Sequence, residues 1–199
     1  MRKAIIFILL TQVVLISCER KSEYRRVIES ELAKNTRYDS LFLGLKFGMT
    51  SKQFFDTCWI MNQKGILKEG PDNTQAQYFI DSTDILGPPV YMRFYPEFKD
   101  GIVYKMPVNF TYKAWAPWNK NFSADSLLPK VVRLMEEWYG PELIKMDGKD
   151  SGLPIWYKVD GNRHMVIYKR DTSNVTVEFL DLLIENPLEL TDSHSQKQQ

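Results

Sequence analysis

Apolar residues recur at helical spacing in two stretches of the chain, and these predict two helices. The first follows Thr50-Ser51-Lys52-Gln53, which has the sequence of a capping box, and Gly65 suits its end. Its apolar positions are Phe54, Phe55, Cys58, Trp59 and Met61. The second is predicted to begin at Asp125 or Ser126, with Pro129 in or near the first turn, and to end at Gly140-Pro141. Its predicted buried positions are Leu128, Val131, Val132, Met135, Trp138 and Tyr139.

Apolar and polar residues alternate after each predicted helix, which is typical of strands with one wet face. The expected strands are 77–80, 91–95, 102–112, 155–159, 163–169 and 175–180. Hairpin turns are expected at Lys99-Asp100-Gly101 and Asp160-Gly161-Asn162. Pro107 removes a ladder donor, so we expect the strand 102–112 to lie at a sheet edge or to be bulged there.

The pattern therefore consists of a helix and about three strands, present twice. It predicts the α+β class, with two helix-then-antiparallel-strand units that form a possible pseudo-repeat. Packing both helices on one face of the sheet would bury both apolar stripes.

The N-terminus has the pattern of a signal peptide. Arg2 and Lys3 precede an apolar run of about 13 residues, which is too short to span a bilayer as a helix. The run ends in Leu15-Ile16-Ser17-Cys18, which resembles the lipobox of bacterial lipoprotein precursors. The resemblance implies cleavage before Cys18, acyl chains such as palmitate on that residue, and a place in the bacterial cell envelope. We expect the outer membrane in preference to the inner one. A signal peptide with an incidental cysteine and a short uncleaved anchor are the alternatives.

These features predict four segments. Residues 1–17 form the signal peptide, 18–39 the lipidated cysteine and a flexible or semi-helical tether, 40–187 the α+β domain, and 188–199 a disordered tail. Without residues 1–17, 24 basic residues remain of the 26 in the whole chain, against 25 acidic ones. This near-neutral balance supplies no general attraction for nucleic acid, so we expect no nucleic-acid partner.

Short motifs carry a second resemblance. Phe47-Gly48-Met49-Thr50 is similar to the opening of the SmpA/OmlA-type small outer-membrane lipoproteins, and Trp138-Tyr139-Gly140-Pro141 with Trp156-Tyr157 is similar in outline. This chain would hold about two copies of the family's single unit. The resemblance implies an accessory, non-catalytic role in outer-membrane β-barrel assembly. Tyr95-Pro96-Glu97-Phe98 and Ala114-Trp115-Ala116-Pro117-Trp118 resemble segments of uncharacterised Gram-negative lipoproteins, which implies no activity.

Catalytic chemistry has no signature in the sequence. There are two histidines, no Cys/His cluster with metal spacing, no phosphate loop and no nucleophile elbow. We therefore expect no enzyme, no cofactor and no metal site. His164 is interpreted as structural or surface, and Cys58 as a buried, inert thiol. Asp81, Asp84, Glu97 and Asp100 would have to converge to act as paired carboxylates, and solvation is their expected use.

Aromatic residues between 78 and 118 are the candidates for binding. Tyr91, Arg93 and Tyr95 are predicted on one strand face, and Trp115 and Trp118 on a following loop. Rings on a solvated face would stack on sugars or on partner side chains, although a core role for most of them is the simpler interpretation. We therefore expect an accessory lipoprotein, held to the membrane by its lipid, that binds another envelope protein. The alternative is binding of glycan or peptidoglycan fragments through the aromatic face.

Overall fold

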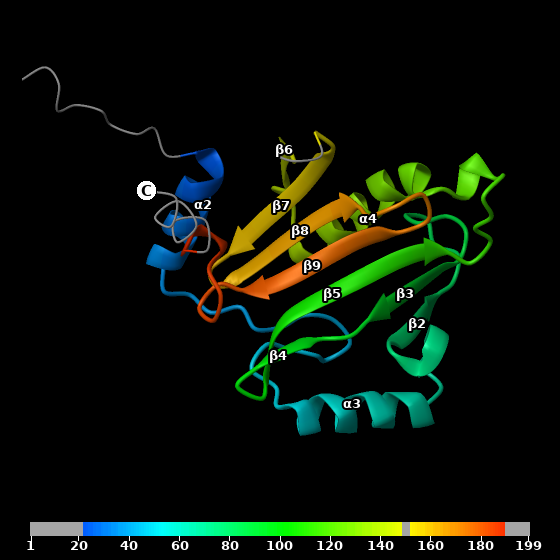
Figure 1. The fold of residues 1–199 in the computed structure, drawn as a ribbon, viewed down its shortest axis with the longest axis horizontal. Coiled ribbons are helices and arrows are strands. Elements are labelled where there is room, and N and C mark those ends of the chain that lie inside the picture. Colours follow the sequence, from blue (N-terminus) through cyan, green and yellow to red (C-terminus); the bar gives the residue numbers. More distant parts are fainter. Residues whose placement is uncertain (1–21, 149–151, 190–199) are drawn as a thin grey trace, which may run out of the picture.

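Nine strands form one antiparallel sheet in the computed structural model of the chain, which describes residues 22–148 and 152–189 (Figure 1). Residues 1–21, with Cys18 and the predicted signal peptide, lie outside the described residues, as does the predicted tail from 190. The helices are α2 (Glu23–Ala33), α3 (Ser51–Gln63) and α4 (Ala124–Tyr139), with 3₁₀ turns η2 (Pro71–Asn73) and η3 (Lys120–Phe122). The strands are β1 (Leu67–Glu69), β2 (Ala76–Ile80), β3 (Val90–Phe94), β4 (Glu97–Lys99), β5 (Ile102–Tyr112), β6 (Ile144–Asp147), β7 (Pro154–Asp160), β8 (Arg163–Lys169) and β9 (Val175–Asp181).

The strand order divides the chain into two matching halves. It runs β1-β2-β3-β5-β9-β8-β7-β6, with β4 paired to the start of β5. Across the sheet, the strands of the first half follow their order in the sequence and those of the second half follow the reverse order. The last strands of the two halves, β5 and β9, therefore pair antiparallel in the middle, where Val108 faces Val177. The predicted α+β class and the helix-then-strands order of both halves are confirmed. The short strands β1, β4 and β6 were not predicted.

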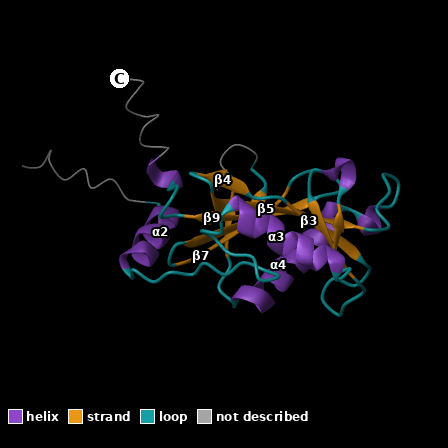
Figure 2. Cartoon of the chain, turned by 90° about the horizontal axis from the view of Figure 1, so that it is seen from below, coloured by secondary structure: helices purple, strands orange, loops and turns teal. Residues whose placement is uncertain are grey.

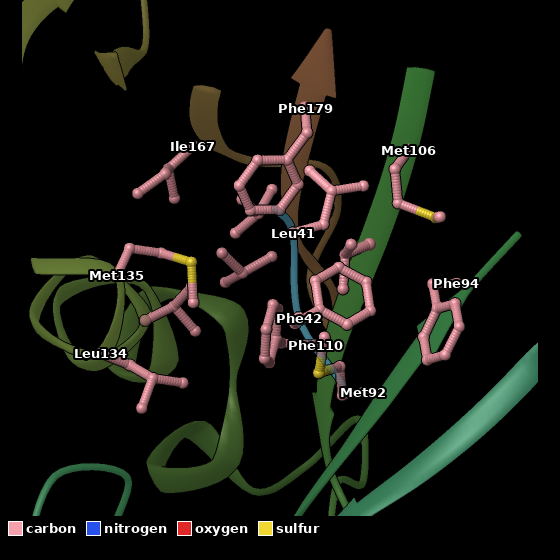
Figure 3. Close-up of a cluster of buried hydrophobic side chains, with 14 of the residues drawn as sticks. Leu41, Phe42, Met92, Phe94, Met106, Phe110, Leu134, Met135, Ile167 and Phe179 are labelled. Atoms are coloured by element: carbon pink, nitrogen blue, oxygen red, sulfur yellow. The ribbon is translucent and has the colours of Figure 1, made fainter. Parts of the chain in front are cut away.

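The main core lies on one face of this sheet, which we call the inner face. Its strands contribute Met92, Phe110, Ile167 and Phe179, and Figure 3 shows these side chains converging with Met135 of α4. Leu41 and Phe42 from the segment before α3 fill the space between them, and the Phe42 and Phe94 rings meet edge to face at 4.9 Å. Burial of such side chains is the dominant favourable term in folding.

The helix α4 packs on the inner face, whereas α3 lies beside the edge strand β1. Phe54 and Met61 of α3 join the main core, and the amide of Asn62 donates to the Leu67 carbonyl on β1 at 3.1 Å. The predicted capping box is present, with Thr50 and Gln53 each binding the other's backbone N–H. It sets the first residue of α3.

The second predicted helix begins earlier than expected, at Ala124. Pro129 is therefore its sixth residue and lies beyond the first turn. Of the predicted buried side chains, Trp138 is 40% exposed, whereas Leu127 and Leu134 are buried and were not predicted. The buried stripe consists of Leu127, Leu128, Val131, Leu134 and Met135 at helical spacing, and Trp138 lies at its margin.

The strand β5 is an interior strand, so the edge position that Pro107 suggested is wrong. Pro107 faces Glu178 on β9. On its other side β5 pairs with β4 up to Lys105 and with β3 from Val108 onward. In the described strands Pro107 therefore has no register partner on that side, because the neighbour of β5 changes there from β4 to β3. The missing N–H is tolerated at this break in the ladder.

The helix α2 belongs to the folded body, although we expected residues 19–39 to form a flexible or semi-helical tether. Ile28 is fully buried and packs with Tyr157 and Val159 of β7. These side chains point away from the inner face, so α2 contacts the other face of the sheet. Figure 2 shows α2 at one end of the sheet. The segment has few apolar positions, yet Tyr24, Val27 and Leu32 join Ile28 in a second cluster.

A polar network fixes the chain between α2 and the core. The carboxylate of Asp181 is fully buried and accepts from Arg37 at 3.1 Å and from the Asn162 amide at 3.0 Å. The predicted turn at Asp160-Gly161-Asn162 is confirmed, and its Gly161 N–H donates to Glu31 of α2 at 3.2 Å. Pairing and hydrogen bonding of this kind are what make a buried carboxylate tolerable.

Candidate functional site

The outer face of the sheet, opposite the main core, carries a row of polar side chains that crosses five strands. In register, Gln77 of β2, Arg93 of β3, Asn109 of β5, Thr176 of β9 and Tyr168 of β8 are successive neighbours. We call this set the cross-strand row. In Figure 1 the strands β5, β9 and β8 lie in front of α4, so the face opposite α4 is turned towards the viewer.

Hydrogen bonds link the cross-strand row sideways. Arg93 Nε donates to Gln77 Oε1 at 2.8 Å, and Thr176 Oγ1 donates to Asn109 Oδ1 at 2.8 Å. Asn109 and Thr176 are buried although they point away from the core, and Arg170 also donates to Asn109 Oδ1 at 3.4 Å. Burial also raises the pKa of the Tyr168 hydroxyl. Hydrogen bonds therefore order the row at two of its neighbouring pairs.

Two of the five candidate binding residues are brought together on this face. The Arg93 guanidinium lies over the Tyr91 ring at 5.1 Å. Next to them the rings of Tyr91 and Phe79 are 5.7 Å apart, and Lys113 Nζ lies 5.1 Å from the Phe79 centroid. The sequence indicated Tyr91 and Arg93 through strand alternation, but it did not indicate Phe79 or Lys113.

The other three candidates lie elsewhere. Tyr95 leaves the strand face and contacts Phe54 and Phe98, with ring centroids 6.1 and 6.4 Å away. Trp115 is half-buried against the main core, and Trp118 on the same loop is 85% exposed. The five residues therefore form no single site. The anchor residue Cys18 lies outside the described residues.

A group of exposed aromatic side chains surrounds the outward side of α3. Phe55 is 49% exposed, Trp59 64% and Tyr95 41%, and the rings of Phe55 and Tyr95 are 6.4 Å apart. We call Phe55, Trp59 and Tyr95 the α3 aromatic patch. The sequence placed Phe55 and Trp59 in the buried stripe. Only Phe54, Cys58 and Met61, at spacings of four and three residues, face the core.

Two groups with acid–base or nucleophilic chemistry are held neutral by burial. Nε2 of His164 forms a hydrogen bond with the Tyr24 hydroxyl at 3.1 Å, and burial lowers the pKa of His164 to about 4. Burial raises the pKa of Cys58 to about 11, so it is a thiol at neutral pH. Both side chains therefore suit a structural role.

Among the residues that the structure describes, no group of three or more His, Cys, Asp or Glu side chains is placed to hold a metal ion. Glu97, one of the candidate carboxylates, pairs with Lys105 at 3.2 Å and accepts from Tyr104. Within the same described ranges, no helix has the length and apolar character needed to cross a bilayer.

Comparison of the chain with protein-family models, with curated proteins and with solved structures finds no match. The resemblances to lipoprotein precursors and to the SmpA/OmlA type stay predictions.

Proposed function

We propose that this chain is a membrane-anchored lipoprotein of the bacterial cell envelope that acts without catalysis, by docking another envelope protein. The observation that carries the docking part is the α3 aromatic patch. Large aromatic side chains that remain exposed together mark interaction surfaces, and Trp and Tyr dominate binding energies there. The partner that suits it is a protein presenting apolar side chains.

The patch rests on a buried ring, which contacts two of its three side chains. Phe54, buried beneath it, contacts Phe55 at 5.5 Å and Tyr95 at 6.1 Å between ring centroids. The closest charges on α3, Lys52 and Asp56, pair with each other at 2.7 Å. Because this rim is internally neutralised, contact with apolar groups is favoured over contact with a charged partner surface. A platform ordered before binding loses little conformational entropy.

The docked helix α2 places the proposed anchor close to the body. Cys18 precedes Ser22, the N-cap of α2, by four positions, which span at most about 14 Å when extended. Acylation of Cys18 would therefore hold the α2 end of the sheet near the bilayer, with the outer membrane favoured over the inner one. Two or more acyl chains make such anchoring essentially permanent.

Recovery of crosslinked neighbours from intact cells tests the docking. Changing Phe55 and Trp59 together to Ser should reduce recovery of the partner about tenfold or more, because both rings are lost from the interface. The matched control is Trp118→Ser, which removes a more exposed tryptophan from a loop that is not part of the α3 aromatic patch. Equal recovery in the two variants would contradict docking through the α3 aromatic patch.

Glycan binding through the outer face is the second candidate, and a separate observation favours it. Gln77 and Arg93 of the cross-strand row place an amide and a guanidinium group beside the Tyr91 and Phe79 rings. Hydrogen-bonding groups next to aromatic rings are suited to sugars. Trp118, which we expected to take part, lies on a loop apart from this row.

A further inference from the structure

A pocket of about 650 Å³ lies where β1, β2 and β3 meet the outer face. Its lining includes Lys68, Gln77, Phe79, Tyr91 and Lys113. This volume falls in the range of small-molecule sites, and the lining combines flat rings with a few polar groups. We call it the β2–β3 pocket.

The β2–β3 pocket is cationic. Lys68 and Lys113 both line it, and among the described residues no carboxylate does. Within the same part of the chain neither lysine forms an ion pair, whereas Lys52, Lys105, Lys158 and Lys169 each do. Two ammonium groups without a protein counter-ion, at the rim of one cavity, favour an anionic ligand.

An aromatic ring holds one of these cations, Lys113, in place. Lys113 Nζ lies 5.1 Å from the centroid of Phe79, and the Phe79 and Tyr91 rings contact each other at 5.7 Å. Arg93 orients the Gln77 side chain, because its Nε–H donates to Gln77 Oε1 at 2.8 Å. Lys68 faces Gln77 in register, so the pocket places one ammonium-bearing side chain next to this amide and the other, Lys113, at the Phe79 ring.

The shape of the neighbouring edge argues against an extended peptide as the ligand. A peptide that added to the sheet here would need the free edge of β1. The helix α3 lies against that strand, and its Asn62 amide already donates to the Leu67 carbonyl at 3.1 Å. A compact ligand with several hydroxyl groups and one negative charge fits the remaining surface better.

We infer that the β2–β3 pocket binds a saccharide that carries a carboxylate. The Lys68 and Lys113 ammonium groups attract the carboxylate, an apolar side of the sugar contacts the Phe79 and Tyr91 rings, and a hydroxyl or acetamido group bonds to Gln77. This inference gives the glycan alternative a ligand class, and it does not depend on docking of a protein at the α3 aromatic patch.

A matched pair of sugars tests the inference. N-acetylmuramic acid and N-acetylglucosamine share the pyranose ring and the acetamido group, and they differ in the lactyl carboxylate. Calorimetric titration of the full-length protein, purified in detergent, should show binding of the first and about tenfold or more weaker binding of the second. Equal affinity for the two sugars, or no heat with either at millimolar concentration, would overturn the inference.

A matched pair of lysines completes the test. Lys113→Gln and Lys68→Gln should each weaken binding of the acidic sugar about tenfold. Lys145→Gln is the control, because Lys145 also lies over a ring, that of Trp156 at 5.4 Å, but belongs to the opposite edge strand β6. Unchanged binding in the first two variants overturns the inference. Lys68 also lines a cavity beside Phe55 and Trp59, whereas Lys113 does not. Lys113→Gln should therefore leave partner recovery through Trp59 unchanged, so failure of this inference and failure of the proposed docking are distinguishable.

Discussion

The Tyr24 hydroxyl lies 3.1 Å from Nε2 of His164, and this contact joins α2 to β8 across 140 positions of the chain. The rings of the two residues also meet edge to face, with centroids 5.7 Å apart. His164 is buried and Tyr24 half-buried, and burial raises the pKa of Tyr24 to about 12 and lowers that of His164 to about 4. Protonation of His164 therefore weakens the junction, because it places a charge in a buried position.

Acid should weaken the fold through His164. Its pKa in the folded protein is below the ordinary value of 6.5, so the unfolded chain binds the proton more strongly. Stability is complete above about pH 6.5, falls as the pH drops towards about 4, and loses up to about 3 kcal/mol in that window. Urea unfolding of the native protein and of His164→Gln at both pH values measures the difference. Equal pH dependence in the two proteins would contradict the assignment.

The Ile28 side chain should hold α2 against the sheet. Ile28→Ala removes a fully buried side chain, and such changes cost about 2–4 kcal/mol. We expect hydrogen exchange in residues 23–33 to accelerate more than exchange in β8 and β9. The control is Arg26→Ala, which changes an exposed side chain two residues earlier in α2 and should alter the exchange little. Protection of α2 that is insensitive to Ile28 would show that other contacts hold the helix.

Gly161 should tolerate no side chain. It has a φ of +53°, and a Cβ there would collide with the carbonyl oxygen of Thr36. Gly101 also has a positive φ, +79°, but a Cβ at that position meets nothing. Gly161→Ala should therefore lower the free energy of unfolding by about 2 kcal/mol more than Gly101→Ala, which carries the backbone strain alone. Thermal unfolding of the two variants compares them directly, and similar melting temperatures would refute the close packing.

Lipidation should depend on Cys18. In cells supplied with labelled palmitate, the native protein should take up label and Cys18→Ser should take up none. The variant should retain residues 1–17, which mass spectrometry of its N-terminus would detect. Labelling of the variant to the native level would end the lipoprotein proposal, while leaving the fold and the α3 aromatic patch untouched.

Local signals in the sequence predicted the elements whose structure is determined locally. The Thr50–Gln53 capping box and the Asp160-Gly161-Asn162 turn each involve residues within three positions, and both are present. The alternation of Val175, Val177 and Phe179 correctly placed these side chains on one face. Such patterns need no information about distant parts of the chain.

Features that depend on distant contacts were not predictable. The apolar stripe of α3 is wider than the surface that covers it, so periodicity could not tell that Phe54 is buried and Phe55 exposed. Docking of α2 depends on Tyr157 and His164, more than a hundred positions away. The β2–β3 pocket likewise requires the pairing of β1, β2, β3 and β5, which brings Lys68 and Lys113 to one cavity.

The most direct test of the central claim is photo-crosslinking from a single position in intact cells. A photoreactive phenylalanine analogue in place of Trp59 should give one discrete crosslinked protein species, because the α3 aromatic patch is proposed to lie in the interface. The same analogue in place of Trp118 should give none, although that position is more exposed. Identical crosslinking from both positions, or crosslinking only from Trp118, would contradict the account.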